Sequence, residues 1–544
     1  MTDTADIKNQ LPYEVEKLSD ESLAPDDAVL QAQGHRPELA RSFSWVGAIG
    51  LSFSIANSWL GYGATFGTPL AYGGGPTVLF GVMIAAVAQW IVLLGLAELC
   101  SALPSSGGQY HFTYILAPPK YKKFAAYTVG ITNVIAWWVS AASGIIYTGI
   151  SAFGIAVFWY PDFQHERWQI YLCYVLVVTL TCKAPRRYDY LTKTTFTLSI
   201  TGLIIVLIAV LASGRGRYHP EILTTFQGTS GWDTAPAWLL SITMGQYCYA
   251  AIGAVTHIAE EMPQPGRRIP LVMYDRPQIN VDILLTVGSN LGVLVGVMTA
   301  VPWVTVMLCG IHDIDAVHKA FIPSMEVYYQ ATGSKVGATA LQAFMTFLYW
   351  SKSVSFACGP SQWITSSRIA WAFSRDVCFQ AQPRIKNGLP FSHYWNFIDP
   401  KFNIPVRTTF LSVSFCLLYG LVYIASSTAF NCIVNMSILF LNISFTVPQA
   451  ILATVGRDKL PVRAFNLGRW GYAVNIFSTV WLTFSGILFC FPTKLPATAG
   501  SMNYGSAVLV GVYILIMLLW LERKNKFTGP KINWDALNMS NKLA

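Results

Sequence analysis

The sequence predicts an all-α membrane protein with twelve transmembrane helices. Three observations lead to this fold class. Only 12% of the 544 residues are charged, against about a quarter in a typical soluble domain, and the mean hydropathy is +0.45. Apolar stretches long enough to cross a bilayer recur along the chain. Lys and Arg are concentrated in alternate loops between these stretches.

The expected helices follow from length, since about 20 mainly apolar residues are needed to cross a hydrocarbon core roughly 30 Å thick. The fourth is short and the eighth is long, and tilting or overhang accommodates both. The expected spans are 44–70, 76–102, 124–158, 168–182, 194–213, 237–259, 281–308, 336–373, 407–427, 430–454, 470–491 and 502–522.

Polar tails flank the helical domain. Residues 1–41 hold 13 charged residues and contain no basic segment followed by an apolar stretch, so we expect no cleavable signal peptide. The first transmembrane helix is then expected to direct insertion. The helical domain is expected at 42–525, and a second cytosolic tail at 526–544.

The basic residues predict the orientation, because short loops rich in Lys and Arg stay in the cytosol. One set of alternate loops and both tails carry 29 basic residues, whereas the opposite loops carry six. Both termini are therefore expected in the cytosol. The net charge of +9 is explained by this asymmetry, and no nucleic-acid partner is needed. Lys352 is the exception, since it lies inside the eighth span.

Cysteine spacing and motif content argue against a metal site and an enzyme. The ten cysteines lie singly, mostly in apolar stretches, without pairs at metal-ligand spacing. The sequence holds no ATP-binding motif, and no nucleophile or metal constellation stands out. No metal or cofactor is therefore expected.

Two of the expected spans carry helix-breaking residues near their middle. The first has the polar pair Asn57 and Ser58 beside Gly61 and Gly63, and the sixth has polar residues and glycines between 245 and 257. Glycine lowers helix propensity by about 1 kcal/mol relative to alanine. Small residues can instead allow close helix packing. Breaks at corresponding positions in two halves favour an inverted-repeat transporter with a midplane substrate site.

Motifs at span ends resemble a known superfamily. They are ELCSALPSSGGQY at 98–110, HIAEEMPQPGRRIP at 257–270, RIAWAFSRD at 368–376 and NGLPFS at 387–392. Together they resemble the amino acid-polyamine-organocation superfamily, and within it the fungal permeases for amino acids, 4-aminobutyrate and choline. APPKYKKFAAY at 117–127 and IASSTAF at 424–430 are similar to the choline permeases in particular.

The resemblance covers roughly residues 41–525 and implies a leucine-transporter-like fold with uptake by alternating access. It implies a five-plus-five inverted repeat, with one repeat at about 44–213 and the other at about 237–454, followed by two extra helices at about 470–522. Span lengths alone do not imply this repeat.

Three departures from the family pattern affect the interpretation. Relatives commonly carry Asp where this chain has Gly253, which removes a counter-charge for choline. Residues 377–386 split a motif that is continuous in relatives, and 274–280 form a second polar insertion. One hypothesis is that both insertions are unspliced introns, which sequencing of the transcript would test.

The substrate is expected at the two breaks. Its carboxylate would bind free backbone N–H groups between Asn57 and Gly63, where a half-helix presents the positive end of its dipole. Its ammonium would meet the faces of Trp59 and Tyr249. The substrate-binding candidates are Asn57, Ser58, Trp59, Gly61, Gly63, Tyr249 and Gly253.

Five ionisable residues are candidates for coupling or gating, since ionisable groups within membranes are functional by default. They are Glu98, His257, Glu260, Glu261 and Lys352. A lysine at the bilayer centre costs about 2.5–3.5 kcal/mol on insertion scales. Its ammonium would replace the ion that sodium-coupled relatives bind, which favours proton coupling. The alternative is a lysine paired with backbone carbonyls for packing, and the four other groups have structural alternatives as well.

The sequence therefore predicts a permease that imports a small amino acid or related amine, with a proton as the coupling ion. A choline permease of the same family is the alternative substrate class. A non-transporting nutrient sensor on the same fold is an alternative of another class. The expected location is the plasma membrane of a fungal cell, with the vacuolar membrane as the alternative.

Overall fold

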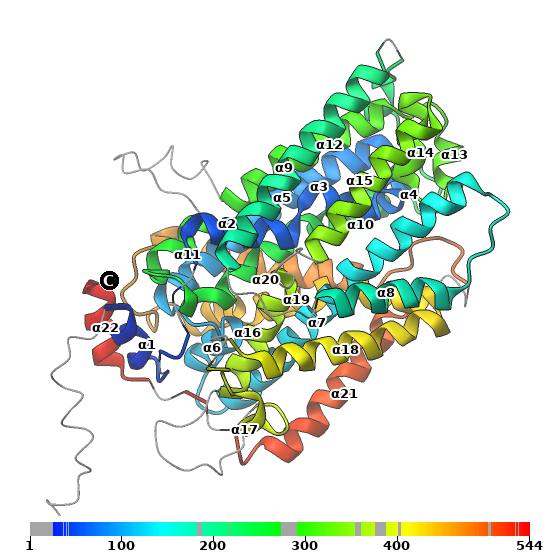
Figure 1. Cartoon of the computed structure of the whole chain (residues 1–544). Coiled ribbons are helices and arrows are strands. Elements are labelled where there is room, and N and C mark those ends of the chain that lie inside the picture. Colours follow the sequence, from blue (N-terminus) through cyan, green and yellow to red (C-terminus); the bar gives the residue numbers. More distant parts are fainter. Residues whose placement is uncertain are drawn as a thin grey trace, which may run out of the picture.

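In the computed structural model, the described residues are 25–35, 37–39, 41, 43–181, 188–215, 217–273, 291–353, 361–375, 388–400, 404–498, 502–527, 529–530 and 532–543. Over these ranges the chain is helical and contains no β-strand, although one isolated antiparallel bridge joins Asp399 and Ile404. The helices pack side by side into an elongated bundle (Figure 1).

The first half of the chain contains a broken helix followed by long continuous ones. The segment predicted as one span at 44–70 forms three short helices, and the Ser44 hydroxyl accepts the Gly47 N–H to begin the first of them. The elements are α1 (Pro25–Ala32), α2 (Trp45–Ala56), α3 (Ser58–Thr65), α4 (Gly67–Gly73), α5 (Gly75–Ala102), α6 (Gln109–Leu116), α7 (Lys122–Trp159), α8 (Arg167–Thr181), α9 (Tyr188–Ser213) and the 3₁₀ helix η1 (Pro220–Leu223).

The second half begins with another broken helix. The elements are α10 (Thr234–Gly245), η2 (Gln246–Cys248), η3 (Ala250–Glu261), α11 (Pro265–Met273), α12 (Leu291–Cys309), α13 (Ile314–Lys319), α14 (Pro323–Thr332), α15 (Lys335–Ser353), α16 (Ser361–Arg375), α17 (Ser392–Trp395), α18 (Val406–Ala425), α19 (Ser427–Val455), η5 (Gly468–Trp470), α20 (Gly471–Leu488), α21 (Gly505–Arg523) and α22 (Trp534–Leu543).

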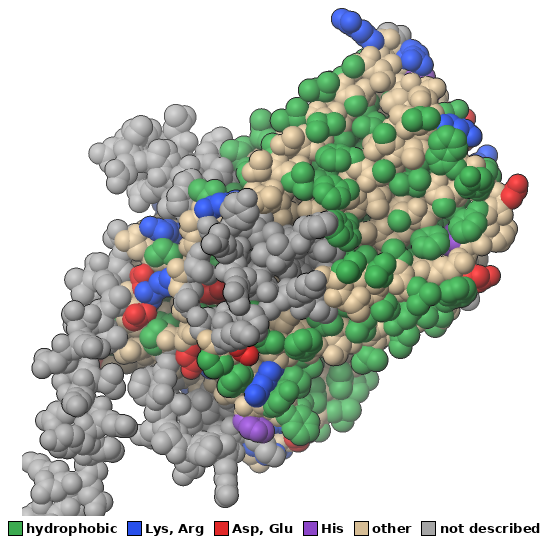
Figure 2. All heavy atoms as spheres, viewed as in Figure 1, with side chains coloured by type: hydrophobic (Ala, Val, Ile, Leu, Met, Phe, Trp, Pro, Cys, Tyr) green, Lys and Arg blue, Asp and Glu red, His purple; other side chains and the backbone are tan. Residues whose placement is uncertain are grey.

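Eight helices in the described part of the chain are long and apolar enough to cross a membrane, with mean hydropathies of 1.3 to 2.5. They belong to α5, α7, α9, α12, α18, α19, α20 and α21. Apolar side chains cover the flank of the bundle, while charged side chains gather toward its ends (Figure 2). The chain is therefore an integral, multi-pass helical membrane protein.

The two polar insertions at 274–280 and 377–386 lie outside the described residues. The eighth expected span, 336–373, is described as two helices, α15 and α16, and residues 354–360 between them are also outside the description. The helices that frame the two breaks, by contrast, are described throughout.

Candidate functional site

The first break lies at Asn57, between α2 and α3. Asn57 has φ 37° and ψ 66°, which is the left-handed region that asparagine tolerates better than most residues with a side chain. Its N–H still donates to Phe53 O, and its carbonyl accepts the Gly61 N–H at 2.7 Å. The chain therefore changes direction at Asn57, while the hydrogen bonds that end α2 and begin α3 are kept.

The second break begins where α10 ends at Gly245. A short 3₁₀ turn follows, Tyr249 leaves helical geometry with φ −125° and ψ −22°, and η3 then continues for 12 residues. A 3₁₀ helix usually extends for only about three or four residues, and a longer one often marks a hinge. The sixth span is thus irregular from its middle to its end.

Hydrogen bonds join the two breaks directly. The Ser58 hydroxyl donates to Cys248 O at 2.8 Å, and one turn away the Ser52 hydroxyl donates to Ile252 O at 3.0 Å. Both serines are fully buried. Two side chains of the first span therefore satisfy backbone carbonyls of the second break.

One face of α3 packs against α9 and α12. Trp59 Nε1 donates to the Ser199 hydroxyl at 3.1 Å, and that hydroxyl donates to Asn57 Oδ1 at 3.0 Å. The rings of Trp59 and Trp303 lie 6.4 Å apart, and a Cβ added at Gly63 would approach Trp303 to 3.2 Å. This face is closely packed protein.

Tyr249 lies at the same interface. Its ring would be 2.9 Å from a Cβ added at Gly296 of α12, and Ser58 Oγ would be 2.6 Å from the same atom. Only glycine at position 296 allows α12 to approach both breaks this closely. The Tyr249 hydroxyl is buried and has no hydrogen-bond partner among the described residues.

The opposite face of α3 meets three tyrosines from three helices, here called the tyrosine cluster: Tyr147 of α7, Tyr247 of η2 and Tyr349 of α15. Tyr349 OH donates to Leu60 O at 2.9 Å, the Tyr147 and Tyr349 rings lie 6.4 Å apart, and Tyr247 OH hydrogen bonds to Ser143 at 3.1 Å. Tyr147 and Tyr247 keep partial exposure although the surrounding helices are largely buried.

The two predicted glycine positions have different surroundings. A Cβ at Gly61 would be 3.1 Å from Ala56 O and 3.8 Å from the Tyr247 ring, so this glycine adjoins the tyrosine cluster. A Cβ at Gly253 would be 2.8 Å from the ring of Phe445 on α19. Position 253 therefore faces tightly packed helix rather than the tyrosine cluster.

Buried ion pairs lie at the end of the bundle where α1 and α22 pack together, here called the terminal end. Glu98 is fully buried near the end of α5. Arg457 donates to it at 2.6 Å and Arg463 at 2.8 Å, and the Leu467 N–H adds a third contact at 3.1 Å. One carboxylate thus anchors the loop between α19 and α20.

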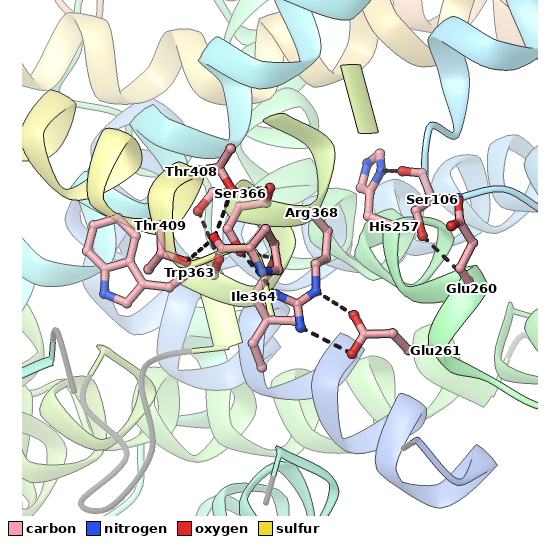
Figure 3. A network of polar contacts seen from close by, with 12 residues as sticks. Ser106, His257, Glu260, Glu261, Trp363, Ile364, Ser366, Arg368, Thr408 and Thr409 are labelled. Atoms are coloured by element: carbon pink, nitrogen blue, oxygen red, sulfur yellow. Dashed lines mark hydrogen bonds and ion pairs between the residues drawn. The ribbon is translucent and has the colours of Figure 1, made fainter. Parts of the chain in front are cut away.

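The two carboxylates at the end of η3 are paired in the same way. Glu260 binds Arg375 of α16 through two contacts of 2.6 and 2.8 Å and also accepts the Ser106 N–H at 3.1 Å. Glu261 forms a bidentate ion pair with Arg368, which lies two turns before Arg375 on the same face of α16 (Figure 3). Both pairs tie the second broken span to α16.

His257 connects this end to the loop after α5. Trp137 Nε1, which is only a donor, lies 3.1 Å from His257 Nε2, so Nε2 accepts and Nδ1 carries the proton. Nδ1–H then donates to Ser106 O at 3.0 Å, as Figure 3 shows. A Cβ at Gly108 would come within 3.0 Å of the ring, which explains glycine there. The neutral imidazole is fully hydrogen bonded.

Lys352 lies in the last turn of α15, but its side chain is outside the described part of the structure. Among the described residues, no group of three or more His, Cys, Asp or Glu side chains could hold a metal ion. The arginines were interpreted only as determinants of topology, and Gly296 carries no local signal that distinguishes it from other glycines of apolar helices. The site residues not selected from the sequence are Tyr147, Ser199, Tyr247, Cys248, Gly296, Tyr349, Arg368, Arg375, Arg457 and Arg463.

A multi-pass helical bundle whose two broken helices meet at a buried, neutral centre defines a membrane transporter. The chain belongs to the amino acid permease family, whose sequence profile matches residues 43–516. The predicted superfamily is confirmed. The family and its relatives are permeases and transporters, so the expectation that the protein is not an enzyme is confirmed as well.

Named relatives cover nearly the whole chain. A choline transporter of Saccharomyces cerevisiae is 29% identical over 502 residues, which are 91% of this chain and 82% of the relative. The swainsonine transporter swnT of Arthroderma benhamiae is 25% identical, with coverage of 91% and 92%. The amino-acid permease BAT1 homolog of Oryza sativa subsp. japonica is 25% identical, with coverage of 94% and 96%.

Proposed function

We propose that this permease imports a small amino acid or related amine by alternating access through a twelve-helix bundle with a five-plus-five inverted repeat. The observation that carries the proposal is the direct hydrogen bond between the two breaks, from Ser58 to Cys248 O. Non-helical backbone at membrane depth is tolerated where it is buried or lines a cavity, and such breaks bind substrate in inverted-repeat transporters.

The two ends of a zwitterion would bind on the face of α3 that carries Gly61. The first turn of α3 presents backbone N–H groups and the positive end of the helix dipole to a carboxylate. The tyrosine cluster presents aromatic faces to an ammonium, each worth about 0.5–2 kcal/mol. Trp59 and Tyr249 would then support the site from behind, because their rings pack toward α9 and α12.

Choline is the second candidate, and a specific observation favours it. Three tyrosines converge beside Leu60 and Gly61, and aromatic faces are the usual partners of quaternary ammonium groups. A relative that is 29% identical is named a choline transporter. In the sequence, Gly253 counts against choline, because relatives commonly carry an Asp counter-charge there. In the structure a side chain at position 253 would face Phe445, so this argument against choline is weaker.

Radiolabelled uptake in a permease-deficient yeast strain would test both candidates. The panel contains amino acids, 4-aminobutyrate and choline, with surface expression measured in parallel. Saturable uptake of an amino acid or 4-aminobutyrate supports the first proposal, and uptake of choline alone supports the second. A surface-expressed protein that carries none of these compounds would overturn both.

Proton coupling is proposed to depend on Lys352, whose ammonium would replace a sodium ion between the first and eighth spans. The position of Lys352 in the chain supports this proposal. Lys352 comes three residues after Tyr349, whose hydroxyl donates to Leu60 O of the first span. Uptake should be indifferent to sodium and should rise with external acidity. The Lys352→Met variant should lose concentrative uptake. If it still accumulates substrate against a gradient, the lysine has a packing role and no role in coupling.

The proposed location is the plasma membrane. Both termini are proposed to lie in the cytosol, which the 29-to-6 division of basic residues between loops supports. The terminal end would then be the cytosolic end. A glycosylation acceptor placed in the loop at 214–233 should be modified, while one placed at 456–469 should not. Modification at 456–469 but not at 214–233 would show that the orientation in the membrane is opposite to the one proposed.

A further inference from the structure

Segments from both ends of the chain meet beneath the terminal end. Helix α1 packs against α22, and the Asn533 N–H donates to Ala32 O at 2.8 Å. Figure 1 shows the two helices side by side at the end of the bundle. Val29 and Leu537 are buried in this contact region. We call the described residues of 25–43 together with 532–543 the terminal strap.

The N-terminal part of the strap is bound to the elements that hold the η3 ion pairs. The Phe43 N–H donates to Glu261 O at 3.0 Å, and the Gln264 N–H donates to Asp26 Oδ2 at 2.8 Å. Leu39 is buried against Trp371 of α16, the helix that carries Arg368 and Arg375. The strap therefore contacts the end of η3 and helix α16, the two elements that the Glu260 and Glu261 ion pairs join.

The C-terminal part of the strap reaches the third ion pair. Asn538 Oδ1 of α22 accepts the Val462 N–H at 3.3 Å, in the loop whose Arg457 and Arg463 bind Glu98. The two segments of the strap thus contact Glu261 itself, helix α16 and the loop that carries Arg457 and Arg463. Separation of α5, η3 and α16 at the terminal end would require the strap to detach.

Two buried histidines form the central contact of the strap. Gln33 Nε2 donates to Pro104 O at 3.3 Å, so its Oε1 faces His111 Nε2 at 3.1 Å and must accept a proton from it. His111 Nδ1 is then an acceptor, and it lies 3.4 Å from His35 Nε2. Ser105 adds a contact to the same His35 nitrogen at 3.3 Å.

This hydrogen-bond chain needs one acceptor nitrogen between the two rings, so it fails when both imidazoles are protonated. His111 Nδ1–H and His35 Nε2–H would then face each other, and two cationic rings would lie 4.8 Å apart. The charged group that acts on both rings is Arg375 of α16, which Glu260 partly neutralises. Asp26 and Asp27 of α1 are occupied by Arg41. Neighbouring charge therefore also opposes protonation of the pair.

We propose that the terminal strap is a latch that holds the terminal end closed, and that protonation of His35 and His111 releases it. This device goes beyond substrate transport. It would couple opening of this end to the acidity of the compartment that the end faces.

The direction of the pH dependence follows from the shifted pKa values. Burial, with a smaller contribution from Arg375, lowers the pKa of His111 to about 3 and lowers the pKa of His35 well below its usual value. The closed arrangement therefore holds fewer protons than the released one, in which exposed His35 and His111 would have pKa values near about 6.5. Binding is at full strength above that pH and weakens below it. Between pH 7.5 and 5.5 the loss is about tenfold for each histidine and about a hundredfold for the pair.

Hydrogen–deuterium exchange of the full chain in lipid nanodiscs tests the proposal, with labelling times scaled for the intrinsic effect of pH. Peptides covering 25–43 and 532–543 should be protected at pH 7.5 and lose that protection at pH 5.5. Equal protection at the two pH values would overturn the latch. The measurement needs no substrate, so its failure is distinct from failure of the proposed transport function.

Two variants assign the response to the histidine pair. His35→Gln combined with His111→Gln keeps donors and acceptors but does not titrate, so the strap should stay protected at pH 5.5. His219→Gln is the matched control, because His219 is exposed in the loop after α9 and should keep the wild-type response. A double variant that releases the strap at pH 5.5 as the wild type does would overturn the role of the pair.

Discussion

The terminal end and the centre of the bundle are both built around broken helices, but their chemistry differs. At the terminal end, three buried carboxylates are paired with four arginines. At the centre, the contacts between the breaks are made by hydroxyls, backbone carbonyls and aromatic rings.

This difference in chemistry affects how each region can open. Removal of one partner leaves a buried charge and costs about 3–5 kcal/mol, whereas a neutral hydrogen bond contributes about 0.5–1.5 kcal/mol. When an end opens to water, however, both partners of an ion pair are hydrated together. A charged end can therefore close firmly and still open reversibly, while a neutral centre can exchange its weak contacts for a substrate.

The largest expected effect is at the charged end. Glu98→Gln should lower stability by about 3–5 kcal/mol, because Arg457 and Arg463 would be left without a buried counter-charge. The melting temperature of the detergent-solubilised protein measures the loss. Glu221→Gln is the control, because that carboxylate is exposed on the short helix η1 and its loss should leave the melting temperature unchanged. Equal melting of the two variants would remove the distinction between the regions.

A second effect tests close packing at the breaks. Gly296→Val and Gly253→Val should each abolish uptake, because the added atoms overlap Tyr249 and Phe445 respectively. Overpacking of this kind costs about 1–3 kcal/mol, so surface expression should persist. Gly511→Val is the matched control, since nothing lies within 4 Å of a Cβ at that position. Normal uptake by both test variants would show that the breaks move apart freely.

A smaller effect is expected in the tyrosine cluster. Tyr247→Leu removes one aromatic face and should raise KM for a cationic substrate about 2- to 30-fold, which corresponds to about 0.5–2 kcal/mol of cation–π attraction. Melting should hardly change. The comparison substrate is a neutral analogue of the same size, whose KM should move less. An equal rise for both substrates would indicate a steric role for the ring.

The smallest effect concerns one hydrogen bond. Tyr349→Phe keeps the ring but loses the bond from its hydroxyl to Leu60 O, which is worth about 0.5–1.5 kcal/mol. A modest change in uptake rate with unchanged expression is expected in the same yeast assay. Loss of uptake as complete as that of Gly296→Val would place this hydroxyl among the essential substrate contacts.

The helical membrane fold and the positions of the two helix breaks could be predicted from local sequence patterns. Hydrophobic length is a local property, as is the tolerance of Asn57 for left-handed backbone, so both can be read along the chain. The superfamily resemblance was likewise carried by contiguous motifs, and the family comparison confirms it.

The pairing of distant groups, by contrast, depends on how the helices pack. Glu98 and Arg457 are 359 residues apart, and no local pattern indicates that they pair. The side of α3 that carries Trp59 faces α12, and the side that carries Gly61 faces the tyrosine cluster, because rotation of a helix about its axis is fixed by its neighbours. The role of Gly296 and the binding of the strap by His111 depend in the same way on helix packing, which brings distant segments together.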